Sequence, residues 1–399
     1  MHVSHPIQKS KIDLQFYGRR SKGIPNIRSK NVLIYWPHGF GDFVFLSVIL
    51  PFLDPSNRYF IVRFGDNNST IFDGCELITP MYVGIDSCHC GDGALIGMQH
   101  FGDRHLDSDG SVKTVEIPHS LYVGCRANNI EVLIDIPFGE SHGGEPFPFH
   151  TKARKMLKRL VSEERLNSFR LNRPLPSTIN FSVSPNVQQW VDARLRNGLG
   201  LDATKHLCVI TRSGYTSVYK NWGHRWREEM PLGKRFEGEE CRDFVKLLKA
   251  KNERWRILVM EDRLFDGNDS VSDFSIGCLS YAQLFDGDLG GPLPFAWILK
   301  AVLKRAELVV GVPSGPTHLA LAMPHLPVVG IWLAHFPSWY EEPRENSIHL
   351  LGRSICESDE AKRPGSFVWR GKYQYKVRKL ETRIAPAEEV MNAVECIFE

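Results

Sequence analysis

Short apolar runs separated by turn residues occupy residues 31–64. Residues 31–36 form such a run, bounded by Pro37 and Gly39, which is typical of a buried parallel strand that ends in a tight turn. The apolar segment 43–53 predicts a helix, and the β-branched and aromatic run 59–64 predicts a second strand. Strand, turn, helix and strand in this order predict a βαβ unit.

A second set of alternating elements begins near residue 185. The pattern predicts strands and helices in turn, with strands at 207–211, 256–260, 308–312 and 328–333 and helices at 187–197 and 295–305. Alternation of this kind indicates a parallel sheet covered by helices on its faces. Residues 386–398 predict a closing helix, because Pro386 suits its first turn.

These two sets suggest how the chain is divided. We expect the basic and polar residues 1–30 to form an N-terminal extension, followed by Rossmann-like domains over 31–185 and 186–383. Residues 166–185 hold three prolines and suit a connection between the domains. Two such domains would leave a central cleft at the carboxyl ends of both sheets, where ligands bind in open α/β folds.

Composition narrows the classes of protein to consider. The 399 residues are 42% hydrophobic and 24% charged, which suits a globular chain of about two domains. A net charge of +3 gives no basic footprint of a nucleic-acid-binding protein. No apolar run is long enough to predict a transmembrane helix, and the N-terminus lacks the apolar core of a signal peptide. The nine cysteines have irregular spacing, so we expect reduced thiols and a cytoplasmic location.

The first candidate for chemistry is the segment Trp36-Pro37-His38-Gly39-Phe40-Gly41-Asp42, directly after the first strand. Its glycines permit a close approach to the backbone, and the following helix offers its N-terminus. At this place Asp42 can take a proton from an acceptor hydroxyl as a general base. Capping of the helix is the alternative role, since Asp is a favoured N-cap residue.

The same segment partly matches a dinucleotide-binding fingerprint. Gly39 and Gly41 supply two of its glycines, but Val44 stands where the third small residue is expected. Asp66 lies at a suitable spacing for a ribose contact. Asp42 would direct a negative charge at the pyrophosphate, which argues against a nicotinamide dehydrogenase.

Two further clusters follow strands of the second set. Thr211-Arg212-Ser213-Gly214 and Lys220 suit a phosphate site, because a cation and hydroxyls come after the carboxyl end of a strand. A solvated loop is the alternative. Glu261 and Asp262 end another strand, where they can bind a ribose or remain solvated loop carboxylates.

The most informative motif is the strand–turn–helix over 308–322, whose turn reads Ser314-Gly315-Pro316-Thr317-His318. Pro316 sits at the helix start, where its missing N–H costs nothing. The N–H groups of this turn, with the hydroxyls of Ser314 and Thr317, make an anion pocket that would fit a diphosphate. His318 can donate a further hydrogen bond. A capped helix with a packed histidine is the alternative.

Cys88-His89-Cys90 is a candidate metal-binding motif. Its spacing differs from the usual two-residue gap, and no second pair of cysteines follows. We therefore expect no metal site.

Together these motifs resemble the heptosyltransferase-like glycosyltransferases of family 9, which have the α/β GT-B fold of two Rossmann-like domains facing a central cleft. The resemblance covers residues 31–50 and most of 186–398. The segments that carry it are Gly41-Asp42, Lys220-Asn221-Trp222, and residues 314–320 and 384–390.

The resemblance implies an inverting, metal-independent transfer of a sugar from a nucleotide-diphosphate donor to an acceptor hydroxyl, without a cofactor. It implies that Asp42 is the general base, that Lys220 contacts the donor phosphates, and that the turn 314–318 cradles the diphosphate. It also implies that the C-terminal helix, residues 384–399, crosses back to the first domain.

One departure from the family pattern concerns the donor sugar. Family members usually carry Asp just before the Ser/Thr-Gly of the turn, where it holds sugar hydroxyls, and this chain has Pro313. Donor recognition must therefore differ, or activity is altered or lost. A non-catalytic nucleotide-sugar or glycan-binding protein of the same fold is the alternative.

Overall fold

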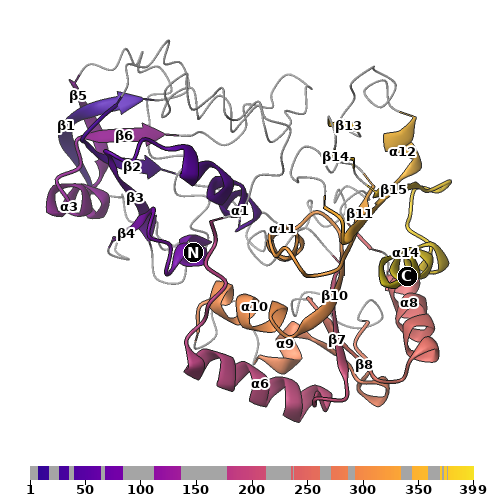
Figure 1. Cartoon of the computed structure of the whole chain (residues 1–399). Coiled ribbons are helices and arrows are strands. Elements are labelled where there is room, and N and C mark those ends of the chain that lie inside the picture. Colours follow the sequence, from indigo (N-terminus) through magenta and orange to yellow (C-terminus); the bar gives the residue numbers. More distant parts are fainter. Residues whose placement is uncertain are drawn as a thin grey trace, which may run out of the picture. The chain divides into compact units, whose positions relative to one another are not determined.

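The computed structural model describes residues 8–17, 27–35, 40–63, 68–83, 112–135, 178–212, 235–236, 238–260, 271–285, 293–333, 344–357, 369–370, 373–374 and 376–399. The chain divides into two compact units, the first of residues 1–171 and 177–180 and the second of residues 172–176 and 181–399 (Figure 1). Both are mixed α/β structures. Within these ranges, none of the helices has the length and apolar character needed to cross a membrane.

A six-stranded sheet with the order β4-β3-β2-β6-β1-β5 forms the first unit. All neighbouring strands in it are parallel except β1 and β5. Helix α1 (Phe40–Ile49) follows β2, and helix α3 (His119–Ala127) follows β5. The strands are β1 (Lys9–Tyr17), β2 (Asn31–Tyr35), β3 (Arg58–Arg63), β4 (Thr79–Tyr82), β5 (Val112–Pro118) and β6 (Val132–Asp135).

Strand β1 corrects the expectation that residues 1–30 form an extension. It pairs antiparallel with β5 and parallel with β6, so it is an internal strand of the sheet. Its side chains alternate, and Ile12, Leu14 and Phe16 are buried in the core of the unit. Residues 9–17 therefore belong to the first domain, because these apolar side chains complete its core.

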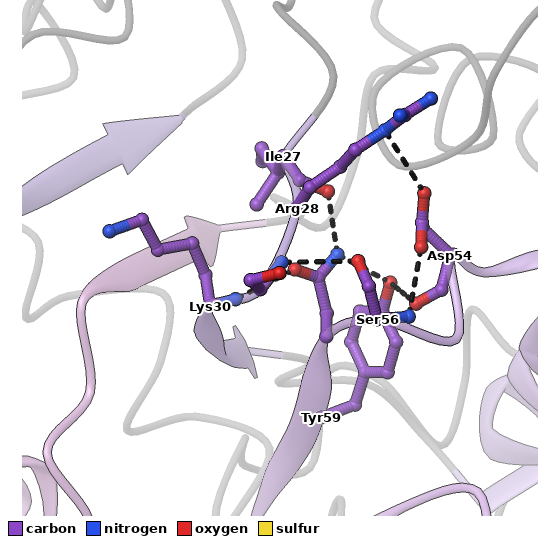
Figure 2. Close-up of polar contacts among 8 residues, drawn as sticks. Ile27, Arg28, Lys30, Asp54, Ser56 and Tyr59 are labelled. Carbon is purple, nitrogen blue, oxygen red and sulfur yellow. Dashed lines mark hydrogen bonds and ion pairs between the residues drawn. The ribbon is translucent and has the colours of Figure 1, made fainter.

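Polar contacts join the segment before β2 to the turn before β3 (Figure 2). The buried amide of Asn57 donates to the carbonyl oxygen of Ile27 at 2.7 Å and to the Tyr59 hydroxyl at 3.1 Å. Its oxygen accepts the Lys30 N–H at 3.0 Å, and the Tyr59 hydroxyl donates to the carbonyl oxygen of Asp54. These bonds fix the entry of the chain into β2, the strand that leads to Asp42.

The second unit has a seven-stranded sheet with the order β15-β12-β11-β10-β7-β8-β9, in which every pair is parallel. Its central strands are continuous apolar runs because both faces of a parallel sheet are covered. A separate pair, β13 (Trp369–Arg370) and β14 (Tyr373–Gln374), is antiparallel. The sheet strands are β7 (His206–Thr211), β8 (Trp255–Val259), β9 (Cys278–Ser280), β10 (Ala306–Gly311), β11 (Val328–Trp332), β12 (Ser347–Leu351) and β15 (Lys376–Lys379).

Strand order in this sheet reverses between β7 and β10. The chain adds β8 and β9 on one side of β7, then returns to place β10, β11 and β12 on the other side. In doubly wound sheets, ligands bind at the carboxyl ends of the strands at such a switch point. The described helices of the unit are α6 (Pro185–Leu199), α8 (Gly238–Lys251), α9 (Tyr281–Leu284), α10 (Phe295–Leu303), α11 (Gly315–Leu321), α12 (Arg353–Cys356) and α14 (Ala387–Phe398).

Helix α14 packs within the second unit, and its expected crossing to the first domain stays a prediction. Its buried face, which includes Val390 and Val394, packs against α8 and against β11 and β12 of the second unit. The Ala387 N–H donates to the Glu240 carboxylate at 2.8 Å. The apolar stripe of this helix is therefore buried within its own unit.

Candidate functional site

The candidate residues of the second unit gather at the carboxyl ends of β7 and β10, the two strands at the switch point. Thr211 ends β7 and Gly311 ends β10, and the two residues are partners in the parallel register. Helix α11 begins four residues after Gly311 and carries the predicted anion-binding turn (Figure 1). The sheet thus brings together segments about 100 residues apart in sequence.

The Thr211 hydroxyl is buried without a hydrogen-bond partner among the residues that the structure describes. A Cβ placed on Gly311 would lie 2.4 Å from the Thr317 hydroxyl oxygen and 3.2 Å from that of Thr211. Both hydroxyls therefore face the Cα of Gly311, and only a glycine leaves them room. Because buried polar atoms are nearly always paired, an unpaired hydroxyl at this place calls for a ligand or a water.

The turn that opens α11 has an unusual hydroxyl arrangement. The Oγ of Ser314 lies 3.1 Å from the Oγ1 of Thr317 and makes no capping hydrogen bond to the helix. Only one of the two hydroxyl hydrogens is needed for this contact, so the other can be donated elsewhere. Gly315 and Pro316 form the first positions of the helix, as predicted.

Arg212 binds the backbone of Phe236. It is fully buried, and its Nε donates to the carbonyl oxygen of Phe236 at 3.1 Å. The Phe236 N–H donates in return to the carbonyl oxygen of Arg212 at 2.7 Å. These bonds hold residue 236 against the end of β7, and the predicted contact of Arg212 with the donor remains a prediction.

His318 is almost fully buried in α11, with 5% of its surface exposed. Its ring centroid lies 6.3 Å from that of the Trp332 indole, at a tilt of 49°. The imidazole thus packs against Trp332, which agrees with the alternative of a packed histidine. It does so within the turn that the sequence predicted. A role in donor binding stays a prediction.

Asp42 is the third residue of α1, in the first unit. The helix begins at Phe40, three residues earlier than the sequence pattern predicted, so Asp42 lies inside the first turn. This position excludes it as the N-cap residue. Lys220, Glu261 and the motif Cys88-His89-Cys90 lie outside the described residues, as does Asp66.

No metal site is visible in the part of the chain that the structure describes, since it contains no group of three His, Cys, Asp or Glu side chains placed to hold an ion. The described cysteines are free thiols. Burial raises the pKa of Cys125 to about 12, and it also raises the pKa of Cys208 above its ordinary value. Both thiols are therefore protonated core residues.

Sequence reasoning missed Gly311, Trp332 and His349. Gly311 could have been identified from the sequence, because a glycine at the end of a buried strand often marks a close approach of another group. No feature of the sequence identifies Trp332 and His349, since their contact joins two strands and depends on the register of those strands.

Comparison with known proteins places the fold. No family model matches the sequence, and no curated protein sequence matches it. The structure is similar to that of a glycosyl transferase of family 9 from Veillonella parvula, with a TM-score of 0.52 and 12% identity, over 94% of this chain and 98% of that chain.

Two further solved structures show a weaker likeness. The ADP-heptose LPS heptosyltransferase II of E. coli has a TM-score of 0.49 and 11% identity, over 92% of this chain and 98% of that one. The iron-containing dodecameric glycosyltransferase TibC of enterotoxigenic E. coli has a TM-score of 0.49 and 16% identity, over 94% of this chain and 77% of that one. At the identity of the Veillonella protein the comparison shows the fold alone. The chain therefore has the two-domain α/β GT-B fold of a family 9 glycosyltransferase, as its motifs implied.

Proposed function

We propose that this protein is a glycosyltransferase that moves a sugar from a nucleotide-diphosphate donor to an acceptor hydroxyl. The observation that carries the proposal is the buried Thr211 hydroxyl at the switch point of the second sheet, which has no partner among the described residues and faces Gly311 as the Thr317 hydroxyl does. The fold shared with a family 9 glycosyltransferase supports the same class of reaction.

The donor diphosphate would bind at the carboxyl ends of β7 and β10. Phosphate oxygens only accept hydrogen bonds, and Thr211, Ser314 and Thr317 offer hydroxyls that can donate. Hydrogen bonds to a charged acceptor are stronger than neutral ones, and burial strengthens them further. Lys220 would add a positive charge to this site. These groups stabilise the negative charge that develops on the leaving diphosphate.

On the acceptor side, Asp42 would act as the general base. In direct displacement the acceptor oxygen attacks the anomeric carbon, its proton passes to the Asp42 carboxylate, and the bond from that carbon to the diphosphate oxygen breaks. Attack opposite the leaving group inverts the anomeric centre. The cationic and hydrogen-bonding groups would carry the leaving-group charge, so the proposal uses no metal and no cofactor.

A second candidate function rests on Pro313. This buried residue stands where the family has a sugar-binding Asp, and its side chain has no group that accepts a hydrogen bond from a sugar hydroxyl. A protein that binds a nucleotide sugar without transferring it fits this feature equally well.

The two candidates separate in one experiment. The wild-type protein and Asp42→Asn are incubated with a panel of UDP-, ADP-, GDP- and CDP-sugars, and released nucleotide is measured together with binding by calorimetry. With no acceptor added, water takes the place of the acceptor hydroxyl, so transfer predicts slow release by the wild type and a fall of about 10²–10⁴-fold in the variant, with binding retained. Asp13→Asn is the matched control. Asp13 is an exposed carboxylate in the sheet of the first unit, where it accepts a hydrogen bond from the Thr114 hydroxyl.

Binding without release by the wild type would favour the non-catalytic candidate. Absence of binding to every member of the panel would contradict both functions. Normal release by Asp42→Asn would remove Asp42 from the mechanism and leave the donor site untouched.

A further inference from the structure

Behind the turn of α11 lies a buried pair of polar rings. The indole N–H of Trp332 donates to the Nδ1 of His349 at 2.8 Å, and both side chains are fully buried. Because an indole can only donate, Nδ1 must be an acceptor, and the proton of a neutral imidazole then sits on Nε2. Nε2 lies 3.3 Å from the Ser347 hydroxyl, which itself donates to the carbonyl oxygen of Arg344. Every donor in this series has an acceptor.

The sequence makes room for this pair. Gly330 lies in the middle of β11 and pairs in register with His349. A Cβ on Gly330 would lie 2.4 Å from the indole nitrogen of Trp332 and 2.9 Å from the Nδ1 of His349. A glycine inside a buried strand weakens the strand, so its presence here indicates a required close approach.

Segment 344–349 acts on α11 at two places, through Trp332 and through Arg344. At the fourth residue of the helix, the Trp332 ring held by His349 packs against the His318 ring, with centroids 6.3 Å apart. At the end of the helix, the Arg344 guanidinium donates to the carbonyl oxygens of Ala320, Leu321 and Met323. A cation at this end also complements the helix dipole.

The polar pair fixes an orientation that apolar packing alone would leave open. Phenylalanine and leucine would fill a similar volume without burying two polar groups, yet neither would determine how the aromatic ring is rotated. A fully satisfied buried hydrogen bond selects one arrangement of the rings that make it. The face that Trp332 presents to His318 is therefore determined by His349.

We propose that His349 is a positioning residue, which fixes the imidazole of His318 at the turn of α11 by holding the Trp332 indole in one orientation. The inference rests on the proposed function in so far as that turn is the site of the donor diphosphate. His349 itself touches no substrate.

The test compares His349→Leu with His349→Asn. Leucine leaves the indole N–H unpaired, whereas the asparagine oxygen can accept it in place of Nδ1. In the unliganded protein, NMR resonances of a labelled His318 ring should shift in the leucine variant and return towards their wild-type positions in the asparagine variant. His206→Asn is the control, because His206 lies at the opposite end of β7 and pairs with Glu307. An unchanged His318 ring in His349→Leu would overturn the proposal, whatever the protein binds.

A second measurement uses the nucleoside diphosphate that the wild type binds among UDP, ADP, GDP and CDP. His349→Leu should weaken its binding by up to about tenfold, the size of a lost aromatic contact, and His349→Asn should restore most of the affinity. In a His318→Ala background, His349→Leu should change the affinity less than about twofold, because coupled residues are not additive. An equal loss in both backgrounds would show a general structural role and overturn positioning. Binding of none of the four would contradict the proposed function, while the ring resonances would still decide the role of His349.

Discussion

The backbone N–H of Val312 donates to the carbonyl oxygen of Thr211 at 3.1 Å. This bond joins the chain just beyond β10 to the last residue of β7, the two strands between which the sheet order reverses. It continues the strand ladder into the segment that leads to Ser314. The Thr211 hydroxyl is therefore positioned by the sheet, and the Thr317 hydroxyl by helix α11.

Gly311→Ala should damage the site and lower stability together. The added methyl would meet the Thr317 hydroxyl oxygen at 2.4 Å and the Thr211 Cβ at 2.9 Å, so the strand end or the turn must move. Overpacking of this kind costs about 1–3 kcal/mol in the free energy of unfolding. Urea unfolding and nucleoside-diphosphate titration measure the two effects.

Gly124→Ala is the matched control for this substitution. Gly124 lies inside helix α3, and its added Cβ would make an ordinary contact of 3.4 Å with the Met81 sulfur. The change should leave binding intact and raise stability by up to about 1 kcal/mol, since alanine favours helix more than glycine does. A Gly311→Ala protein as stable and as competent in binding as Gly124→Ala would contradict the described packing.

The stability of the second unit should depend on pH through His349. Burial, with a smaller effect of the Arg344 charge, lowers the pKa of this imidazole from 6.5 to about 3. Between these two values the unfolded chain binds a proton that the folded protein does not, so stability falls as the pH falls from about 6.5 towards 3. His349→Asn removes this titration, and the stability difference between wild type and variant should shrink by about 2 kcal/mol from pH 7 to pH 5. Parallel stability curves for the two proteins would contradict a buried neutral His349.

Asn57→Ala should destabilise the first unit. Its amide satisfies the carbonyl oxygen of Ile27 and the N–H of Lys30 in a buried position, so its removal leaves both groups unpaired (Figure 2). The expected loss is about 1–3 kcal/mol, measured by urea unfolding. Ser56→Ala in the same turn removes one exposed hydrogen bond from the Ser29 N–H and should cost about 1 kcal/mol or less. Equal effects of the two substitutions would contradict the central place of Asn57.

Sequence patterning predicted the central strands of both sheets well. The expected strands at 31–36, 59–64, 207–211 and 328–333 correspond to β2, β3, β7 and β11 within one or two residues. Parallel strands covered on both faces are continuous apolar runs, so a single sequence identifies them. The helices at 187–197 and 295–305 correspond to α6 and α10.

Strands with polar side chains were missed for two physical reasons. β15 has the sequence Lys-Val-Arg-Lys and lies at the edge of the sheet that the described strands form, and charged residues are typical of such edges. β12 is fully buried, yet it contains Ser347 and His349, whose polarity is hidden in hydrogen bonds to other elements. Burial of a paired polar group cannot be inferred from composition along one strand.

In the candidate site, too, the sequence predicted local features and missed those that depend on contacts between distant segments. The turn 314–318 and Thr211 could be predicted because strand, turn and helix follow one another locally. The approach of Thr211 to Gly311 could not, because it depends on the register between strands about 100 residues apart.

The central claim is that the unpartnered Thr211 hydroxyl binds the donor diphosphate, and Thr211→Val tests it most directly. Valine keeps the shape of the side chain and removes only the hydroxyl, which has no partner among the described residues, so folding stability should be unchanged or slightly raised. Affinity for the nucleoside diphosphate that the wild type binds, measured by calorimetry, should fall about 10- to 150-fold, the value of a hydrogen bond to a charged group. Wild-type affinity in a normally folded Thr211→Val protein would contradict the claim.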